Sequence, residues 1–476
     1  MTKLASPPPT APNTPSRSLE IEEIDMTDTV HDDIGEASLP SEPTSRGFGD
    51  RDPIFGDSPE GTDVWQRVPY NADDYGPVTD YATDFDHADP HYNANAPEVW
   101  KQLREDGCPV AHSDRYGGMW TPITHDTVQE IAYDTDHFTS RAVVVSVGRP
   151  GDLAMPAPVG GVPPISSDPP FHGMARRLLL PPFAPKQIEP WEEEIRTLCR
   201  RLLDEMGEVV PGETIVDAAV QYAQHIPVNV IGRMLGFPEK DEALFRTFVY
   251  DAMERINEEP GTRDGLDDLG KYIADQIEDH RENPRDDLTS YLMGVDIDGE
   301  KLTDEMVGGS IILLLVAGID TTWSAIGSSL WHLAQTPGDR QRLIDDPEVM
   351  TFAIEEFLRA YAPVTMARMV AKDHDFHGNA MKKDDWVLLP FPAANRDPKQ
   401  FEDADKFIID REVNRHAAFG LGIHRCLGSN LARLELRVAI EEFVARFPNF
   451  ELAGETTWSV GQIRGPRVLP VRILAD

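Results

Sequence analysis

A short stretch near the C-terminus repeats apolar residues at helical spacing. Leu427, Leu431, Leu434 and Val438 recur at steps of four, three and four, so they fall on one face of a helix. The pattern predicts that this helix begins at Cys426. Its first unpaired N–H groups and its positive dipole end would then point at the cysteine sulfur, and both favour thiolate over thiol.

A longer helical pattern covers residues Thr303 to Gln335. Thr303 is a suitable N-cap, acidic residues occupy the first turn, and a Pro-Gly pair directly after the pattern would end the helix. The middle of this apolar helix contains Asp320 and Thr321. Burial of a carboxyl or a hydroxyl group in an apolar helix costs free energy, so we expect both side chains to have a function. The alternative is a threonine that only bonds back to the preceding turn.

The remaining pattern predicts a mainly helical domain with small sheets. Helical periods dominate residues 182–447, and short strands such as residues 468–473 follow. Residues 1–60 keep no hydrophobic period, contain nine prolines, and carry 13 acidic against 4 basic residues, a charge of −9. We therefore predict a disordered extension over residues 1–80 and a single large, mainly α domain over residues 81–476.

The composition favours a soluble, cytoplasmic protein. The chain of 476 residues has only three cysteines, which favours a reducing compartment over a disulfide framework. Its N-terminus lacks the apolar core of a secretory signal, and the longest apolar run, residues 311–319, is too short to span a bilayer. A net charge of −39 opposes binding to nucleic acid or to anionic membranes. We therefore expect neither nucleic acid nor a membrane among the partners.

The candidate chemistry centres on Cys426, which stands between glycines in residues 419–428. Glycines let the backbone approach a flat, bulky partner, and Gly428 removes a side chain just past the sulfur. A lone thiolate does not suit a structural zinc site, which takes four ligands. It suits the axial position of a haem iron, where a thiolate favours O–O cleavage. The alternative is a buried structural cysteine before a core helix.

Residues Phe419 to Gly428 resemble the haem-binding signature of the cytochrome P450 family, Phe-x-x-Gly-x-His/Arg-x-Cys-x-Gly, with every fixed position filled. Four separate motifs stand in the family's order, and the resemblance to its soluble bacterial members runs from about Asp80 to the C-terminus. It implies the mainly α P450 fold, haem b as the cofactor, and Cys426 as the iron ligand. Phe419 and Gly428 would lie beside the cofactor.

His172 and Arg176 lie one turn apart on a predicted helix. Such a pair, taken alone, is usually solvated surface. In the resembling family a His-x-x-x-Arg pair holds a haem propionate. The resemblance extends this task of neutralising the two propionates to Arg368, His416 and His424.

The resemblance also assigns roles to two further motifs. It implies that Thr321 steers protons to bound oxygen and that Asp320 relays them. Glu356 and Arg359, adjacent on a helix face, would form the family's buried pair, with Arg411 as the third partner. That role is structural, and an ordinary surface pair is the alternative.

A long apolar segment, residues 141–165, lies where the family lines its substrate pocket. Together with parts of the long helix and of the strand that carries Arg368, it predicts these pocket residues: Val143, Val144, Val145, Leu314, Ala317, Gly318, Val364 and Ala367. The apolar side chains favour a small apolar organic substrate. The alternative is that residues 141–165 form an ordinary buried loop that binds no substrate.

The activity implied by the resemblance is monooxygenation, as hydroxylation or O/N-dealkylation: one atom of O₂ enters the substrate and the other leaves as water. A ferredoxin and its NAD(P)H-dependent reductase would supply electrons. Residues 411–446 carry six arginines against four glutamates, a charge of +2, which would suit an acidic electron donor or an ordinary helix surface. The alternatives are a peroxide-driven peroxygenase, which tends to replace the Asp-Thr pair, and a non-catalytic haem protein that binds or senses a ligand.

Overall fold

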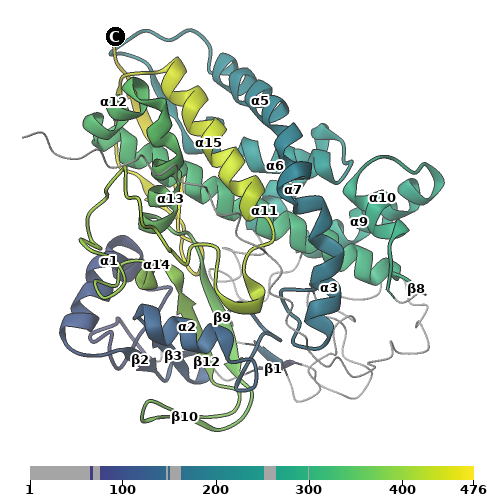
Figure 1. Cartoon of the computed structure of the whole chain (residues 1–476), viewed down its shortest axis with the longest axis vertical. Helices are drawn as coiled ribbons and strands as arrows, with labels where there is room; N and C mark the ends of the chain where they lie inside the picture. Colours follow the sequence, from purple (N-terminus) through teal and green to yellow (C-terminus); the bar gives the residue numbers. More distant parts are fainter. Residues whose placement is uncertain are drawn as a thin grey trace, which may run out of the picture. The chain divides into compact units, whose positions relative to one another are not determined.

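The long apolar helix is present as α11 (Asp304–Gln335), with both ends where the sequence predicts them. The Thr303 hydroxyl accepts a hydrogen bond from the Met306 N–H at 3.3 Å and so caps the first turn. Pro337 follows and begins the next helix, α12 (Pro337–Asp345). Most of α11 is buried, and it runs through the middle of the helical part of the protein (Figure 1).

The computed structural model describes residues 65–67, 75–145, 148–150, 162–250, 264–297 and 300–475. All of them belong to one structural unit, residues 40–476. The predicted disordered extension falls largely outside the described residues. The part that is described corrects the prediction, because Trp65–Arg67 forms strand β1 and pairs with β5 (Gly148–Pro150). Arg115 also donates a hydrogen bond to the Gly76 carbonyl, so residues just before 81 already contact the domain.

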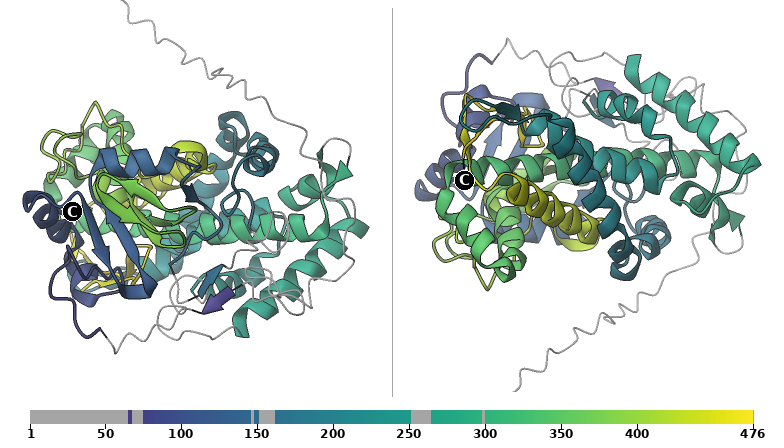
Figure 2. Two further views of the ribbon diagram at one scale, coloured as in Figure 1. Left: turned by 90° about the horizontal axis from the view of Figure 1, so that it is seen from below. Right: turned by 90° about the horizontal axis from the view of Figure 1, so that it is seen from above.

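Helices make up about half of the described residues. The other α-helices are α1 (Pro90–Glu105), α2 (His125–Tyr133), α3 (Phe171–Leu179), α4 (Pro185–Ile188), α5 (Glu192–Glu205), α6 (His225–Met234), α7 (Glu242–Tyr250), α9 (Asp264–Glu282), α10 (Leu288–Gly294), α13 (Met350–Ala360), α14 (Phe391–Ala394) and α15 (Ser429–Arg446). α15 packs against α5 and α11, and α6 packs against α11 (Figure 2). The contact between α6 and α11 is close: a Cβ added at Gly318 would meet Ile231 at 3.5 Å.

The strands form small sheets. The largest has five strands in the order β2 (Val110–Ser113), β3 (Met119–Pro122), β12 (Trp386–Pro390), β9 (Thr365–Val370) and β4 (Phe138–Thr139). A three-stranded sheet has the order β13 (Phe450–Leu452), β16 (Pro470–Ile473) and β6 (Ile215–Asp217). Two-stranded pairs join β7 (Asp296–Ile297) to β8 (Glu300–Lys301), β10 (His374–Phe376) to β11 (Asn379–Met381), and β14 (Thr457–Trp458) to β15 (Pro466–Val468). The predicted mainly α fold with small β-sheets is therefore confirmed.

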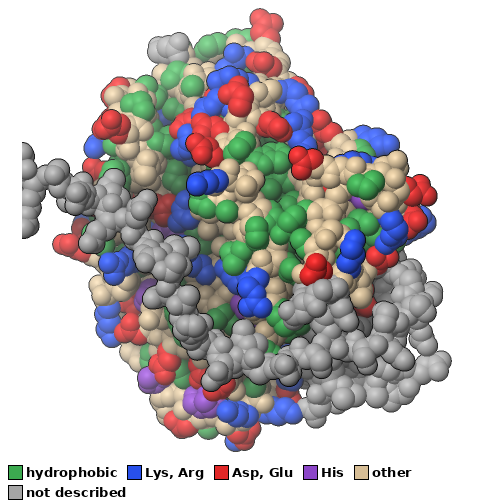
Figure 3. Space-filling view, turned by 45° about the vertical axis from the view of Figure 1, so that its right-hand side comes forward, with side chains coloured by type: hydrophobic (Ala, Val, Ile, Leu, Met, Phe, Trp, Pro, Cys, Tyr) green, Lys and Arg blue, Asp and Glu red, His purple; other side chains and the backbone are tan. Residues whose placement is uncertain are grey.

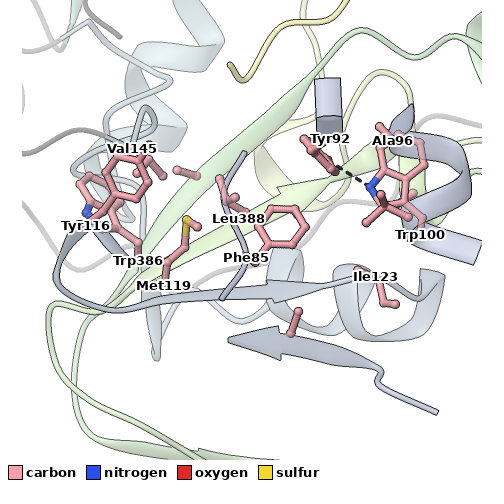
Figure 4. Packing of buried hydrophobic residues seen from close by; sticks show 14 of the residues in the cluster. Phe85, Tyr92, Ala96, Trp100, Tyr116, Met119, Ile123, Val145, Trp386 and Leu388 are labelled. Atoms are coloured by element: carbon pink, nitrogen blue, oxygen red, sulfur yellow. Dashed lines mark hydrogen bonds between the residues drawn. The ribbon is translucent and has the colours of Figure 1, made fainter. Parts of the chain in front are cut away.

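A buried cluster fixes the five-stranded sheet against α1. Trp386 and Met119 are fully buried between neighbouring strands, and Phe85 and Trp100 extend the cluster to the first helix (Figure 4). The Trp100 indole N–H donates to the Tyr92 hydroxyl at 3.1 Å, so the polar end of a buried aromatic ring has a partner. This packing holds β9, which carries one of the predicted site residues.

Among the described residues, α11 is the one helix long and apolar enough to cross a bilayer. Within its most apolar window, 72% of the residues are buried inside the protein. Burial to this extent is typical of a core helix, because a membrane span exposes its apolar side chains to lipid.

A buried carboxyl on α15 predicts a pH-dependent stability. Glu435 is 2% exposed, its Oε2 atom has no hydrogen-bond partner among the described residues, and burial raises its pKa to about 8. The raised pKa keeps Glu435 protonated in the folded protein at neutral pH, whereas it ionises above about pH 4.3 when unfolded. Folding therefore becomes less favourable as the pH rises from about 4.5 to about 8.

We expect Glu435→Gln, which has the same shape and no charge, to remove this cost. The variant should lie within about 1 kcal/mol of the wild type at pH 5 and be more stable by on the order of 3 kcal/mol at pH 7. Denaturant unfolding at both pH values measures the difference. An equal effect of the substitution at the two pH values would contradict the assignment.

Candidate active site

Cys426 lies in the turn between η10 (Gly422–His424) and α15, so the helix begins three residues later than the sequence pattern predicts. The loop is closed by the Cys426 N–H, which donates to the Phe419 carbonyl at 2.7 Å. Gly422 has a φ of +69°, and a side chain there would overlap the Ala132 carbonyl of α2. The glycine is therefore required for the loop to sit against α2.

The environment of the Cys426 thiol differs from the prediction of a favoured thiolate. Cys426 is exposed at the surface, but the protein atoms around its thiol exclude part of the water and raise its pKa above the usual value. The Gly428 N–H and the guanidinium groups of Arg176 and Arg425 lower that pKa in part. The late start of α15 explains part of the difference, because the helix terminus is not at the sulfur. Coordination to a metal ion would deprotonate the thiol outright.

Four groups that can carry positive charge converge beside the cysteine loop. His172 and Arg176 come from α3, Arg368 from β9, and His424 from η10. The rings of His172 and His424 are 4.4 Å apart between centroids, and the Arg176 guanidinium donates to the Arg425 carbonyl at 2.6 Å. All four were predicted from the sequence, and the structure brings them together.

None of these four groups forms an ion pair with a carboxylate in the part of the chain that the structure describes. The buried His172 Nε2 atom has no hydrogen-bond partner among the described residues, and the buried Arg368 donates to the carbonyl of its own neighbour, Ala367. Burial and mutual repulsion lower the pKa of His172 to about 4 and that of His424 to about 2, and burial lowers the pKa of Arg368 to about 10. An anion supplied from outside the chain would offset the cost of burying these donors.

The cluster fits the carboxylate edge of haem b. Two propionates would pair with Arg176, Arg368, His172 and His424, and the same cofactor would place its iron at the neighbouring Cys426 thiolate. The only carboxylate that acts on the cluster in the described part of the chain is that of Asp168. It is already held by hydrogen bonds from the Thr139 hydroxyl and from the Ser140 N–H at 2.8 Å.

The structure gives His416 other partners. Its Nε2 atom pairs with Glu355 at 3.1 Å, and its Nδ1 atom accepts from the Ala418 N–H at 3.1 Å. Both ring nitrogens therefore have partners within the chain, and the role of His416 as a propionate donor stays a prediction. Glu355 also binds Arg433 through two hydrogen bonds of 2.6 and 2.9 Å.

Phe419 is held by this second cluster. The Arg433 guanidinium lies over its ring at 4.5 Å from the centroid, so the start of the cysteine loop is fixed from α15. Sequence reasoning missed Glu355 and Arg433. Glu355 directly precedes Glu356, and Arg433 follows the Cys426 loop. Both lie on helices with many charged residues, so nothing in the sequence distinguishes them from surface residues.

Asp320 and Thr321 lie in the middle of α11, as predicted. Asp320 is 1% exposed; one carboxylate oxygen accepts from Arg467 at 2.7 Å, and the other has no hydrogen-bond partner among the described residues. Burial raises the pKa of Asp320, and Arg467 lowers it in part. The Thr321 hydroxyl donates to the Ala317 carbonyl at 2.7 Å, which is the back-bonded arrangement considered as the alternative.

Arg467, from β15, is a site residue that the sequence did not reveal. Besides Asp320 it contacts Ser324 at 3.1 Å, and its guanidinium lies 4.3 Å from the centroid of the Trp323 ring. Trp323 therefore has a role in the fold: its ring supports the cation that pairs with the buried Asp320. The two partners are 147 residues apart in the chain, so no local pattern connects them.

The predicted contacts among Glu356, Arg359 and Arg411 are present. Glu356 and Arg359 are both fully buried, and two hydrogen bonds of 2.7 Å join them. Arg411 donates to the same carboxylate at 3.0 Å, as do the Ile408 N–H at 2.8 Å and the Asn414 amide at 3.1 Å. Ile408 thus binds the Glu356 carboxylate through its backbone N–H, a contact that does not depend on the side chain at this position.

The predicted pocket residues divide into two groups. Ala317 is exposed, Val143, Val144 and Val364 are partly exposed, and Leu314 is 8% exposed on α11. The others do not fit the prediction. Val145 and Ala367 are buried in the cluster with Trp386 and Met119, and Gly318 faces Ile231 of α6.

Strand alternation explains why Ala367 is misplaced. Successive side chains on β9 point to opposite faces, so Arg368 and Met366 share one face while Ala367 and Met369 share the other. Neighbouring residues of the strand, such as Ala367 and Arg368, therefore cannot face the same pocket. The partly exposed Met366 lies on the same face as Val364.

Comparisons with known proteins agree with this site. The family model "Cytochrome P450" matches residues 262–458. The polyketide biosynthesis cytochrome P450 PksS of Bacillus subtilis is 35% identical over 65% of this chain and 77% of its own length. The mycinamicin IV hydroxylase/epoxidase of Micromonospora griseorubida is 33% identical over 64% of this chain and 79% of its own length. The solved structure of PksS superimposes with a TM-score of 0.72, at 29% identity, over 82% of this chain and 100% of that chain. The chain therefore belongs to the cytochrome P450 family.

Proposed function

We propose that this haem monooxygenase oxidises a small apolar organic substrate by hydroxylation or O/N-dealkylation, with electrons from a ferredoxin and its NAD(P)H-dependent reductase. The observation that carries the assignment to this site is the set of four buried or half-buried donors, His172, Arg176, Arg368 and His424, which lie beside the Cys426 thiol and form no ion pair with a carboxylate of the described residues. When bound there, haem supplies the reductive activation of O₂ and the transfer of one oxygen atom.

The chain's own part in the reaction begins with binding. Arg176, Arg368, His172 and His424 hold and orient the cofactor by its propionates, and the Glu355–Arg433 pair keeps Phe419 and the cysteine loop in place. Apolar side chains on α11 and β9 exclude water from the substrate side. The partly exposed Val143, Val364 and Met366 are apolar, which supports an apolar substrate.

Proton delivery is the proposed role of α11. Asp320 is held at one oxygen by Arg467, so its second, unpartnered oxygen is available to accept and release a proton. The Thr321 hydroxyl is bonded to the Ala317 carbonyl in this structure and would rotate to donate toward the substrate side. The presence of both residues favours an O₂-dependent reaction over a peroxygenase or a non-catalytic haem protein.

The electron donor is proposed from the charges near the cysteine loop. Of the six arginines in residues 411–446, four are in ion pairs: Arg411 with Glu356, Arg433 with Glu355, Arg437 with Glu192 and Arg446 with Asp204. Most of the expected basic face is therefore neutralised, and acidic and basic side chains are interspersed on the surface (Figure 3).

The exposed Arg415 and Arg425 have no carboxylate within 4 Å among the described residues. Both precede Cys426 in the chain, as do the exposed apolar residues Val413 and Ile423. Cations next to exposed apolar side chains suit a small acidic redox protein. The three cysteines are unpaired, which fits the reducing cytoplasm that we propose as the location.

The proton-delivery role predicts the effect of Thr321→Ala. We expect product formed per NAD(P)H consumed to fall by about tenfold or more, because a positioned proton donor typically contributes about 10²–10⁴-fold to the step it serves. The measurement is peroxide released and product formed per NAD(P)H, with a substrate identified by a shift of the Soret band. Thr322→Ala, which alters the buried neighbour, is the control and should stay coupled. Unchanged coupling in Thr321→Ala would remove the residue from the relay.

A further inference from the structure

Two histidines and an aspartate lie close together outside the candidate haem site. Asp134 ends α2, His137 follows in the turn before β4, and His374 begins β10. One potential ligand atom from each lies within 4.8 Å of the other two. In the part of the chain that the structure describes, this is the one group of three such residues with that geometry. Histidine side chains also appear toward the lower end of the face in Figure 3, at the height of β10 in Figure 1.

The backbone places these side chains firmly. β4 pairs with β9, and the Ala371 N–H donates to the His137 carbonyl at 2.8 Å, so the segments that carry the two histidines run side by side. The two rings are stacked, with centroids 4.0 Å apart and planes 28° apart. Asp134 accepts from the His137 N–H at 3.0 Å, and its carboxylate pairs with the ring Nδ1 atom at 2.7 Å. The cluster is therefore preorganised before any ion binds.

We propose that Asp134, His137 and His374 form a binding site for a divalent transition-metal ion of the zinc type, with water as a further ligand. Two imidazoles and one carboxylate are a donor set that suits Zn²⁺ better than Mg²⁺ or Ca²⁺, which prefer oxygen ligands. Zinc ligands at about 2.0–2.2 Å from the ion lie about 3.3–3.5 Å apart. The ligand atoms farthest from one another, within 4.8 Å, would move closer, and the paired Asp134 and His137 atoms, 2.7 Å apart, would separate by less than about 1 Å. The three side chains are all partly exposed, which gives the ion a path of entry.

An ion at this site would join three separate segments. It would tie the end of α2 to the turn before β4 and to the β10–β11 hairpin. The end of α2 also supports the cysteine loop, because the Ala132 carbonyl faces Gly422. The expected consequence is a more stable fold around the haem loop, without a part in the oxygen chemistry.

The test uses the full-length holoenzyme without an affinity tag, treated with a chelator and then dialysed. Zn²⁺ is added in competition with a chromophoric chelator, and the thermal unfolding midpoint is followed in parallel. We expect one Zn²⁺ per chain at the tighter class of site and a Tm increase of about 2–4 °C at saturation. In His137→Ala and His374→Gln, the affinity should fall by about tenfold or more.

His377→Ala is the matched control. His377 is an exposed histidine in the same hairpin, it pairs with Glu130 at 2.8 Å, and it lies outside the three-ligand group. Its replacement should leave the Zn²⁺ affinity unchanged. An intact Soret band verifies that each variant is folded. Absence of stoichiometric Zn²⁺ uptake by the wild type, or equal affinity in the wild type and in folded His137→Ala and His374→Gln, would overturn the proposal.

Discussion

Replacement of Glu356 by alanine is expected to destabilise the protein by about 3–5 kcal/mol, because it leaves a buried guanidinium without its counter-charge. Arg359 is fully buried, and the Glu356 carboxylate is the one anion that pairs with it among the described residues. The same carboxylate holds Arg411 and the backbone at Ile408. The loss is a large part of the total stability of an ordinary domain, which is about 5–15 kcal/mol.

Denaturant unfolding and the haem content of the purified variant measure this effect. Glu348→Ala is the matched control, since Glu348 is an exposed acid just before the same helix, α13. Glu356→Gln keeps the volume of the side chain but removes its charge. It should show most of the destabilisation expected for Glu356→Ala. A Glu356→Ala variant that accumulates with full haem and unfolds within about 1 kcal/mol of the wild type would show that the network has no role in holding the fold.

Replacement of Cys426 by alanine is expected to abolish monooxygenation. Cys426 is the only cysteine beside the donor cluster in the described structure, because Cys108 and Cys199 belong to other parts of the fold. Without an axial thiolate the bound haem would lack the electron density that favours O–O cleavage. We expect turnover with NAD(P)H, a ferredoxin and its reductase to fall below detection.

The matched control for this variant is Cys108→Ser, which alters a partly buried thiol in the N-terminal cluster. It should retain turnover within about twofold. The propionate donors, His172, Arg176, Arg368 and His424, remain in Cys426→Ala, so the variant should still bind some haem. Turnover at the wild-type rate in Cys426→Ala would exclude the cysteine as the iron ligand.

The features that sequence reasoning predicted correctly are local or belong to a recognised motif. The cap at Thr303 and the end of α11 depend on residues within a few positions of each other. The donors on α3, β9 and η10 belong to sequence motifs of the family. They could therefore be chosen from the sequence without knowing how far apart they lie in the structure. The start of α15 was wrong by three residues, because an apolar period shows a helix but does not show where its first turn begins.

The features that were missed depend on contacts between distant parts of the chain. Arg467 reaches Asp320 because β15 packs against α11, and nothing near either residue in sequence indicates this pairing. The error at Ala367 has a different cause, since strand alternation was available as a rule but requires the strand's boundaries. The contact of His416 with Glu355 was missed because the two residues are 61 positions apart in the chain.

The most direct test of the central claim is the difference spectrum of the reduced, purified protein with and without carbon monoxide. We expect a strongly red-shifted Soret band, because the Cys426 thiolate would ligate the haem iron. A folded, haem-loaded protein with a band typical of histidine or neutral thiol ligation would contradict the haem-thiolate site.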